Sequence, residues 1–149
     1  LFETKCSMVA SICAPSVVTA YHSNVDYSNV LMIAVSQSGG ARDIYEVMKH
    51  CDEQGGVCVC VTNVEGSLMT QAGKYQVRNH CGPERSVTAG KSYLTQVTIV
   101  TALAAYISGD PELLSVLDEL GTIVERSLAV LEPQVRDVVR YYRNTEHML

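Results

Sequence analysis

A continuous apolar run at residues 30–35, read Val-Leu-Met-Ile-Ala-Val, most constrains what this chain can fold into. A strand with apolar side chains on both faces has to be buried on both faces, which is typical of a parallel sheet covered by helices. The run stops at Ser-Gln-Ser-Gly-Gly, residues 36–40. Apolar residues at helical spacing then predict a helix from about 41 to 53, which completes one strand–loop–helix unit.

The remaining chain continues this alternation and predicts an open, doubly wound α/β fold with helices on both faces of a mostly parallel sheet. We expect strands at 16–20, 57–62 and 75–78, and helices at 3–13, about 85–107, 111–131 and 134–148, the last two separated by Glu132-Pro133. The 149 residues suffice for one such domain. We place the α/β domain at residues 1–110 and a helical extension at 111–149.

Charge and hydropathy exclude several functional classes. The net charge is −5, and Lys and Arg are scattered without a basic stripe, so we expect no nucleic-acid partner. The apolar stretch 93–107 contains four Thr or Gln residues and is too short and too polar for a membrane span, so we interpret it as a buried core helix. Residues 1–5 lack the pattern of a secretory signal.

The six cysteines favour a cytoplasmic chain with reduced thiols over a disulfide scaffold. We place Cys6 and Cys13 on a helix and Cys58 and Cys60 on a strand, and no Cys-x-x-Cys pair occurs. Two cysteines at alternate strand positions share one face, where they serve as small apolar packing residues.

The loop Ser36–Gly40 is the first candidate site. Ligands of open α/β sheets bind at the carboxyl ends of strands, and the N-terminus of the following helix suits a phosphate. Two hydroxyls and one amide side chain stand there beside two glycines. On these residues alone, a phosphate site and an ordinary Ser/Gly helix cap are both open.

A second candidate is the segment 80–84, where Glu84 is either a general base or a helix-terminal carboxylate. Gly90-Lys91-Ser92 ends like a phosphate-binding P-loop but lacks its first glycine, since Arg85 stands there. The four histidines show no metal-ligand spacing. We therefore expect no metal or organic cofactor.

Three motifs in order resemble the sugar isomerase (SIS) domain family. They are the apolar strand with Ser36-Gln37-Ser38-Gly39, the strand 57–63 with Gly66-Ser67-Leu68, and Cys81-Gly82-Pro83-Glu84 through Lys91-Ser92-Tyr93. The resemblance covers roughly residues 16–149 and is closest to the isomerase half of glucosamine-6-phosphate synthase and to related phosphosugar deaminases and deglycases. It implies that Ser36, Gln37, Ser38 and Gly39 hold a sugar phosphate and that Val87 lines the sugar site.

The chain departs from the family pattern at several positions. Gly40-Ala41 replace the usual Glu-Thr or Glu-Ser, so one phosphate-binding hydroxyl is missing, and Ala89-Gly90 replace small hydroxyl residues. The family's first strand, which is normally central, has no counterpart here. In two-module relatives, the catalytic groups come largely from the second module and a neighbouring subunit.

The resemblance implies a cytoplasmic phosphosugar-binding domain. It implies that this domain is part of an enzyme, which is an isomerase, aminotransferase-like enzyme, deaminase or deglycase. Such an enzyme moves a proton between adjacent carbons of a ring-opened sugar. The alternative is a non-catalytic module that senses a sugar phosphate or serves assembly. As partners we expect a hexose or amino-sugar phosphate and a second copy or second SIS module, with no membrane contact.

Overall fold

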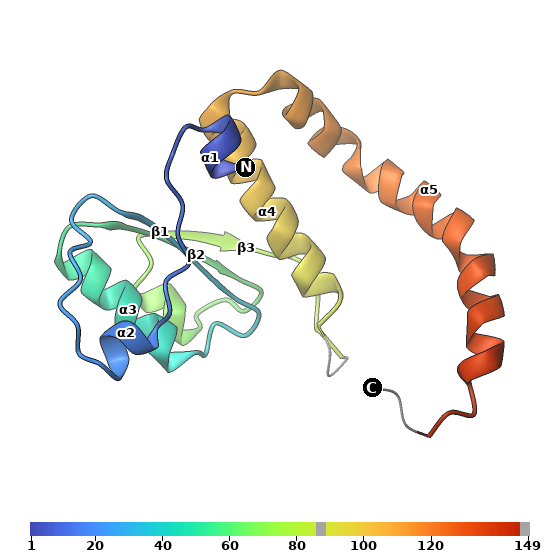
Figure 1. Cartoon of the computed structure of the whole chain (residues 1–149), viewed down its shortest axis with the longest axis horizontal. Helices are drawn as coiled ribbons and strands as arrows, with labels where there is room; N and C mark the ends of the chain where they lie inside the picture. The colour runs from blue at the N-terminus through green and yellow to red at the C-terminus, as the bar shows by residue number, and fades with distance from the viewer. Residues whose placement is uncertain (86–88, 147–149) are drawn as a thin grey trace. The chain divides into compact units, whose positions relative to one another are not determined.

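A computed structural model describes residues 1–85 and 89–146 of the chain. The described residues form a parallel sheet of three strands in the order β1-β2-β3, within the compact unit Leu1–Ser108 (Figure 1). The strands are β1 (Leu31–Ser36), β2 (Val57–Thr62) and β3 (Tyr75–Arg78). In the register, Leu31 lies opposite Val57 and Val59 lies opposite Tyr75. The predicted strands at 57–62 and 75–78 are confirmed at their bounds, and the apolar run at 30–35 is confirmed with a shift of one residue.

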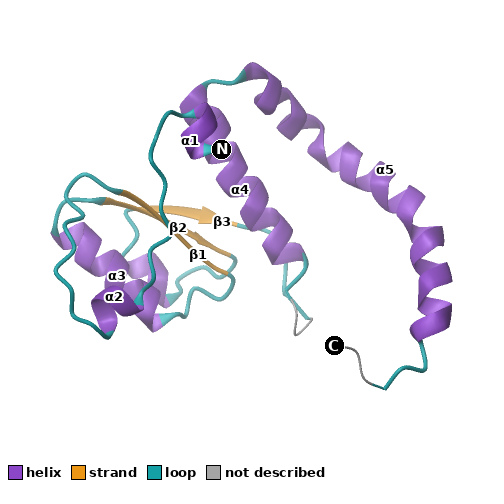
Figure 2. Ribbon diagram, viewed as in Figure 1, coloured by secondary structure: helices purple, strands orange, loops and turns teal. Residues whose placement is uncertain are grey.

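Helices cover both faces of this sheet, as predicted. Helix α3 (Arg42–Glu53) lies on one face and α4 (Lys91–Ser108) on the other (Figure 2). Side chains alternate along β2, so Cys58 and Cys60 point into the core cluster that α3 completes. Burial raises the pKa of the Cys58 thiol to about 12. These cysteines therefore pack as neutral apolar groups, and none of the six, all in the described ranges, forms a disulfide.

The predicted helix at 3–13 is wrong beyond its first turn. Helix α1 spans only Phe2–Lys5. Ser7 has a left-handed φ of 54°, and the Met8 N–H donates to the Phe2 carbonyl at 3.1 Å. A left-handed residue, followed by an N–H that donates back to a carbonyl of the helix, terminates a helix. Cys6 and Cys13 consequently lie outside any helix.

The predicted strand at 16–20 is also wrong, because α2 (Ser16–Thr19) is a single helical turn there. Pro15 precedes it with φ −55° and ψ −31°, and its carbonyl accepts from Thr19 Oγ1 at 3.0 Å. The strand preference of Val17 and Val18 is a weak one, and this turn geometry overrides it.

Two further bounds differ from expectation. Helix α4 starts at Lys91, well after residue 85, and the predicted residues 86–88 lie outside the described ranges. In the second compact unit, Gly109–Leu149, the two expected helices are one helix, α5 (Pro111–Tyr142), with Pro133 inside it. A proline deprives the helix of one N–H donor, but its fixed φ is helical, and the helix continues through it.

Helix α4 is only partly buried. Ser92, Ala104 and Ala105 are buried, whereas Leu94 and Tyr106 are 62% and 75% exposed. The expectation of a buried core helix therefore holds only in part. Over the residues that the structure describes, no helix has the length and hydropathy of a membrane span.

Candidate functional site

Three loops meet at the carboxyl edge of the sheet, one after each strand. The Asn63 N–H donates to the Gln37 carbonyl at 3.1 Å, which joins the loops after β1 and β2. The Asn63 side-chain amide donates to the Gly82 carbonyl at 2.7 Å, which joins the loops after β2 and β3. Both segments that the sequence singled out therefore stand on one edge, the position where open α/β sheets bind ligands.

The two serine hydroxyls of the first loop fold back on their own backbone. Ser36 Oγ accepts from the Gly39 N–H at 3.2 Å, and Ser38 Oγ accepts from the Gly40 N–H at 3.3 Å. A hydroxyl that accepts one bond keeps its own proton for donation. The loop is thus held in shape by bonds that leave two O–H donors for an anion.

Gly39 occupies a position that admits no side chain. Its φ is +62°, and a Cβ there would lie 2.1 Å from Ser67 Oγ and 2.8 Å from Thr62 Oγ1. The backbone of the loop after β1 therefore rests directly on the turn after β2. The Gly39 carbonyl also accepts from the Met69 N–H at 2.9 Å, just beyond that turn.

Ser67 is a site residue that reasoning from single motifs did not select. Its Oγ is buried and has no hydrogen-bond partner among the described residues, although it lies against Gly39. A buried hydroxyl without a partner is costly, so this one is suited to a ligand or an ordered water. The only signal in the sequence is its place in the Gly66-Ser67-Leu68 turn after a strand.

Helix α3 starts at this loop without a capping side chain. Its N-cap residue is Ala41, and no side chain accepts a hydrogen bond there as a cap. The first N–H groups of a helix have no intrahelical partner, and the helix dipole places partial positive charge beside them. Arg42, the first helical residue, is 85% exposed in its side chain and pairs with Glu46 at 3.6 Å. The Asp43 carboxylate in the same turn accepts from the Ile44 N–H at 2.9 Å and adds a negative charge, so only the other free N–H groups of this helix end favour an anion.

Asn79 adds a polar side chain on the same edge. It directly follows β3, it is 7% exposed, and its N–H donates to the Thr62 carbonyl at 3.1 Å. Neither its amide nitrogen nor its amide oxygen has a hydrogen-bond partner among the described residues. Its position after a strand is the sequence signal that could have found it.

Glu84 makes the contacts of a helix cap. Its Oε2 accepts from both the backbone N–H and the Oγ of Ser92 at 3.1 Å. The Ser92 backbone bond, above all, lowers the pKa of Glu84, and the neighbouring Lys91 adds to this effect. An ionised carboxylate in this position stabilises the start of α4. Val87, the expected lining residue of the sugar site, lies outside the described residues.

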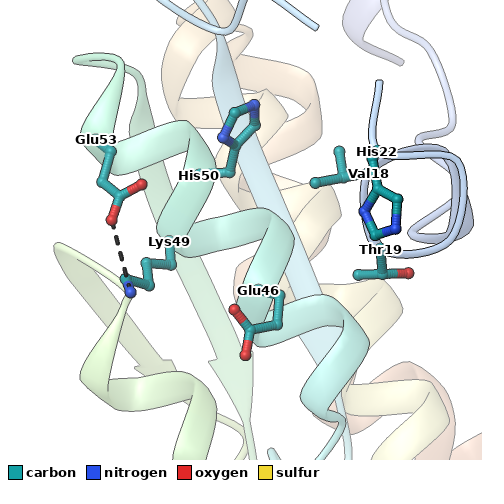
Figure 3. Close-up of a pocket in the computed structure, with 7 residues that line it drawn as sticks. All are labelled: Val18, Thr19, His22, Glu46, Lys49, His50 and Glu53. Carbon is teal, nitrogen blue, oxygen red and sulfur yellow. Dashed lines mark ion pairs between the residues drawn. The ribbon is translucent and has the colours of Figure 1, made fainter. Parts of the chain in front are cut away.

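A separate polar pocket of about 350 Å³ lies between α2 and α3 (Figure 3). Glu46, Lys49, His50 and Glu53 reach it from α3, and His22 comes from the segment after α2. Lys49 and Glu53 form an ion pair at 3.6 Å within it. None of the predicted site residues lines this pocket, and the described residues hold no group of three or more His, Cys, Asp or Glu that suits a metal ion.

An apolar groove of about 910 Å³ follows β1. It is lined mainly by residues 8–15 and by β1 itself, with Ile44 and Val47 of α3. Within the described residues, β1 pairs only with β2. The groove therefore borders the unpaired edge of the strand that carries the candidate loop.

The sheet and its helices define an open α/β domain whose candidate site residues gather at the carboxyl ends of its strands. The family model for the SIS domain matches residues 14–106. The chain belongs to the SIS domain family, which confirms the resemblance of its three motifs.

Known proteins similar to the chain agree with this assignment. The glutamine–fructose-6-phosphate aminotransferase (isomerizing) of Aquifex aeolicus is 30% identical over 136 residues, which cover 87% of this chain and 23% of that protein. The enzyme of the same name from Thermococcus kodakarensis is 38% identical over 108 residues, covering 72% and 16%. The chain thus spans less than a quarter of these relatives.

Solved structures share the fold. A Silicibacter pomeroyi protein, proposed to be a phosphosugar isomerase, superposes with a TM-score of 0.76 at 29% identity, covering 80% of this chain and 36% of that one. The C-terminal domain of glucosamine-fructose-6-phosphate aminotransferase from Francisella tularensis superposes with a TM-score of 0.73 at 21% identity, covering 98% and 43%. The chain is an SIS domain of the kind found in phosphosugar isomerase-like proteins.

Proposed function

We propose that the loop Ser36–Gly39 and the N-terminus of α3 bind the phosphate group of a phosphorylated sugar. The observation that carries the proposal is the meeting of two serine hydroxyls, a left-handed glycine and an uncapped helix N-terminus at the end of β1. Donors and partial positive charge converge there, as phosphate recognition requires. The curated relatives are named for fructose 6-phosphate, which supports a hexose or amino-sugar phosphate as the ligand class.

Each residue of the loop has a distinct role in this proposal. Ser36 and Ser38 donate their hydroxyl protons to phosphate oxygens, and Gln37 places its side-chain amide beside them. Gly39 lets the backbone approach both Ser67 and the ligand. Val87 lines the sugar in this proposal.

The enzyme to which the domain belongs is proposed to act on ring-opened sugar phosphates by proton movement between adjacent carbons. Isomerase, aminotransferase-like, deaminase and deglycase activities all use that step. In such an enzyme Glu84 is the candidate acid/base group of this chain.

A sensor without catalytic activity is the second candidate, and two observations favour it. Ala41 provides no hydroxyl at the N-cap of α3, so the phosphate has one contact fewer. The carboxylate of Glu84 is engaged by Ser92, which leaves it a weak base. Turnover of fructose 6-phosphate by a longer protein that contains this domain separates the two candidates, because a sensor binds the sugar phosphate without converting it.

The proposal extends to organisation and location. Residues 1–110 form the phosphosugar-binding domain, and residues 111–149 form a connector or dimerisation segment that joins a second copy or a second SIS module. Three buried and three partly or fully exposed free thiols support a reducing, cytoplasmic environment.

A thermal-shift titration tests the phosphate site directly. Fructose 6-phosphate and glucosamine 6-phosphate are expected to raise the melting temperature, and fructose is not. A ligand at a hundredfold its Kd stabilises the folded state by about 2.7 kcal/mol. Ser38→Ala is expected to abolish the shift, whereas the control Ser115→Ala, at an exposed position of α5, retains it. Equal shifts for both variants, or none for the unmodified chain at millimolar ligand, contradict the proposal.

A further inference from the structure

The segment after β2, residues 65–71, supports the candidate loop from below and is called the supporting turn here. Ser67 Oγ lies against Gly39, and the Met69 N–H donates to the Gly39 carbonyl at 2.9 Å. Met69 itself is fully buried in the core cluster. The position of the supporting turn therefore determines where the backbone of the candidate loop lies.

Strand β3 holds the supporting turn at two points, one on each side of Ser67. Arg78 Nη1 donates to Glu65 Oε2 at 2.7 Å, two residues before Ser67. Gln76 Nε2 donates to the Thr70 carbonyl at 2.9 Å, three residues after it. Gln76 and Arg78 are alternate residues of one strand, so their side chains leave the same face of the sheet. The supporting turn is thus bound to β3 near both of its ends.

The register of the sheet places these two side chains on the α3 face. Arg78 lies opposite Thr62, and Gln76 lies opposite Cys60. Cys60 belongs to the core cluster that α3 completes, and Thr62 Oγ1 donates to the Gln37 carbonyl at 3.3 Å. The contacts that hold the supporting turn are therefore on the same face of the sheet as the contact between β2 and the candidate loop.

Gly66 is the residue of the supporting turn with the greatest backbone freedom. It lies between Glu65 and Ser67, its φ is +67°, and no atom lies within 4 Å of its Cβ position. Glycine loses more conformational freedom on folding than any other residue, and nothing packs against this one. The ion pair of Glu65 with Arg78 links the chain just before Gly66 to a strand of the sheet, and so restricts that freedom.

We propose that Arg78 is a positioning residue of the phosphate site, which acts through the supporting turn on the loop Ser36–Gly39. This inference rests on the proposed phosphate function of that loop. The ion pair with Glu65 keeps the supporting turn where it contacts Gly39. Without the ion pair, the binding-competent arrangement is a smaller fraction of the folded molecules, and the apparent Kd rises by the inverse of that fraction.

The exposure of the ion pair limits the size of this effect. The side chains of Arg78 and Glu65 are 42% and 76% exposed. Exposed ion pairs change an equilibrium constant by about fivefold at most. Arg78→Met removes the charge and keeps a long apolar stem, so the packing of that stem is largely retained. We expect this variant to fold and to bind a sugar phosphate about threefold to fivefold more weakly.

Calorimetric titration of the full chain with fructose 6-phosphate measures this effect. Arg78→Met and Glu65→Gln are each expected to raise the Kd about threefold to fivefold, whereas Arg78→Lys keeps the ion pair and should change it less. The exchanged variant Glu65→Arg/Arg78→Glu is expected to restore the affinity. Arg136→Met is the matched control, because it removes a comparably short ion pair from α5, with Glu132 at 2.6 Å, and should leave the Kd unchanged.

Amide hydrogen exchange followed by NMR tests the positioning role without a ligand. The Met69 N–H, which donates to Gly39, is expected to exchange about threefold to fivefold faster in Arg78→Met. The Val57 N–H, which donates to the Val30 carbonyl at 2.9 Å, is expected to exchange at an unchanged rate. Equal acceleration of both amides indicates a general loss of stability and contradicts the positioning role.

The outcomes distinguish this inference from the phosphate site on which it rests. If the unmodified chain does not bind fructose 6-phosphate, the proposed function and this inference both fail. If it binds and Arg78→Met leaves the Kd unchanged, only the positioning role fails. A raised Kd without faster exchange of the Met69 N–H also overturns that role, because Arg78 then contacts the ligand directly. Failure of the exchanged variant to restore the affinity overturns it as well.

Discussion

Replacing Gly39 by alanine tests how closely the candidate loop rests on the neighbouring turn. The new Cβ would lie 2.1 Å from Ser67 Oγ, 2.7 Å from Ser67 Cβ and 2.8 Å from Thr62 Oγ1. Such separations are shorter than any van der Waals contact, so the loop or the turn has to move. The backbone at this position also has a φ of +62°, which alanine adopts poorly.

The expected cost is the sum of two physical terms. A left-handed backbone costs a residue with a Cβ about 1–2 kcal/mol. Overpacking a well-filled site costs about 1–3 kcal/mol. The free energy of unfolding should thus fall by about 2–5 kcal/mol, which is a large share of the stability of a typical domain.

Urea denaturation followed by circular dichroism measures this change. Alanine variants of two other glycines separate the backbone cost from the packing cost. Gly55 has a φ of +84° with no atom within 4 Å of its Cβ position, so Gly55→Ala should show the backbone cost alone. At Gly40 the nearest atom is Ser38 Oγ at 3.6 Å, and Gly40→Ala should cost least. Equal stabilities for Gly39→Ala and Gly55→Ala would refute the close contact. Ser67→Gly should partly restore the Gly39→Ala variant, since it removes both atoms of that residue that clash.

Three further predictions concern the cap, one buried thiol and one carboxylate. Ala41→Ser supplies the missing hydroxyl at the N-cap of α3 and should raise the free energy of unfolding by about 0.5–2 kcal/mol in urea titrations, while Ala41→Val should not. Burial raises the pKa of Cys58 from 9.0 to about 12, so the folded state retains a proton that the unfolded state loses. The contribution of Cys58 to the free energy of unfolding should be constant below pH 9 and fall by up to about 1.4 kcal/mol per pH unit above it. If the free energy of unfolding falls equally fast with alkaline pH in Cys58→Ala, other groups cause the effect. The pKa of Glu84 lies below 4.5, so its contribution is present above that pH and is lost as the pH falls through the lowered pKa. Melting temperatures between pH 3 and 7 should therefore depend less on pH in Glu84→Gln, and an unchanged pH dependence would argue against the cap.

Local patterns were sufficient for the sheet and for one helix packed on it. The apolar run at 57–62 correctly predicts burial on both faces, since five of its six residues are buried. The run at 30–35 correctly predicts a strand, but in β1 only Ala34 is buried and Val35 is exposed, so the expected burial on both faces is wrong there. The short helical turn α2 was mistaken for a strand because two valines favour strands locally, whereas Pro15 and the closing hydrogen bonds decide the backbone. Helix α5 was divided at Pro133 because a proline in a sequence normally indicates a helix break. Inside this long helix the proline removes one backbone N–H donor, and the helix continues through it.

The candidate site likewise contains residues that the sequence could predict and residues that it could not. Ser36–Gly39 could be predicted because the loop directly follows an apolar strand. Ser67 could not, since its contact with Gly39 joins residues that are distant in the chain and becomes visible only when β1 and β2 are in register. Both interpretations of Glu84 were open from its sequence neighbours, which favoured the helix-terminal carboxylate, and the Ser92 contacts give that cap its physical basis.

The sequence by itself determined the fold class, the family motifs and the loop at the end of the first strand, because these depend on residue types at short, regular spacing. Tertiary structure alone decided which turn supports that loop, which polar groups on the carboxyl edge lack partners, that α2 is helical, and that α5 continues through Pro133. Those properties depend on close approach between segments far apart in the chain. Local preferences of a few tenths of a kcal/mol per residue are small beside the free energies of packing and hydrogen bonding that fix such contacts.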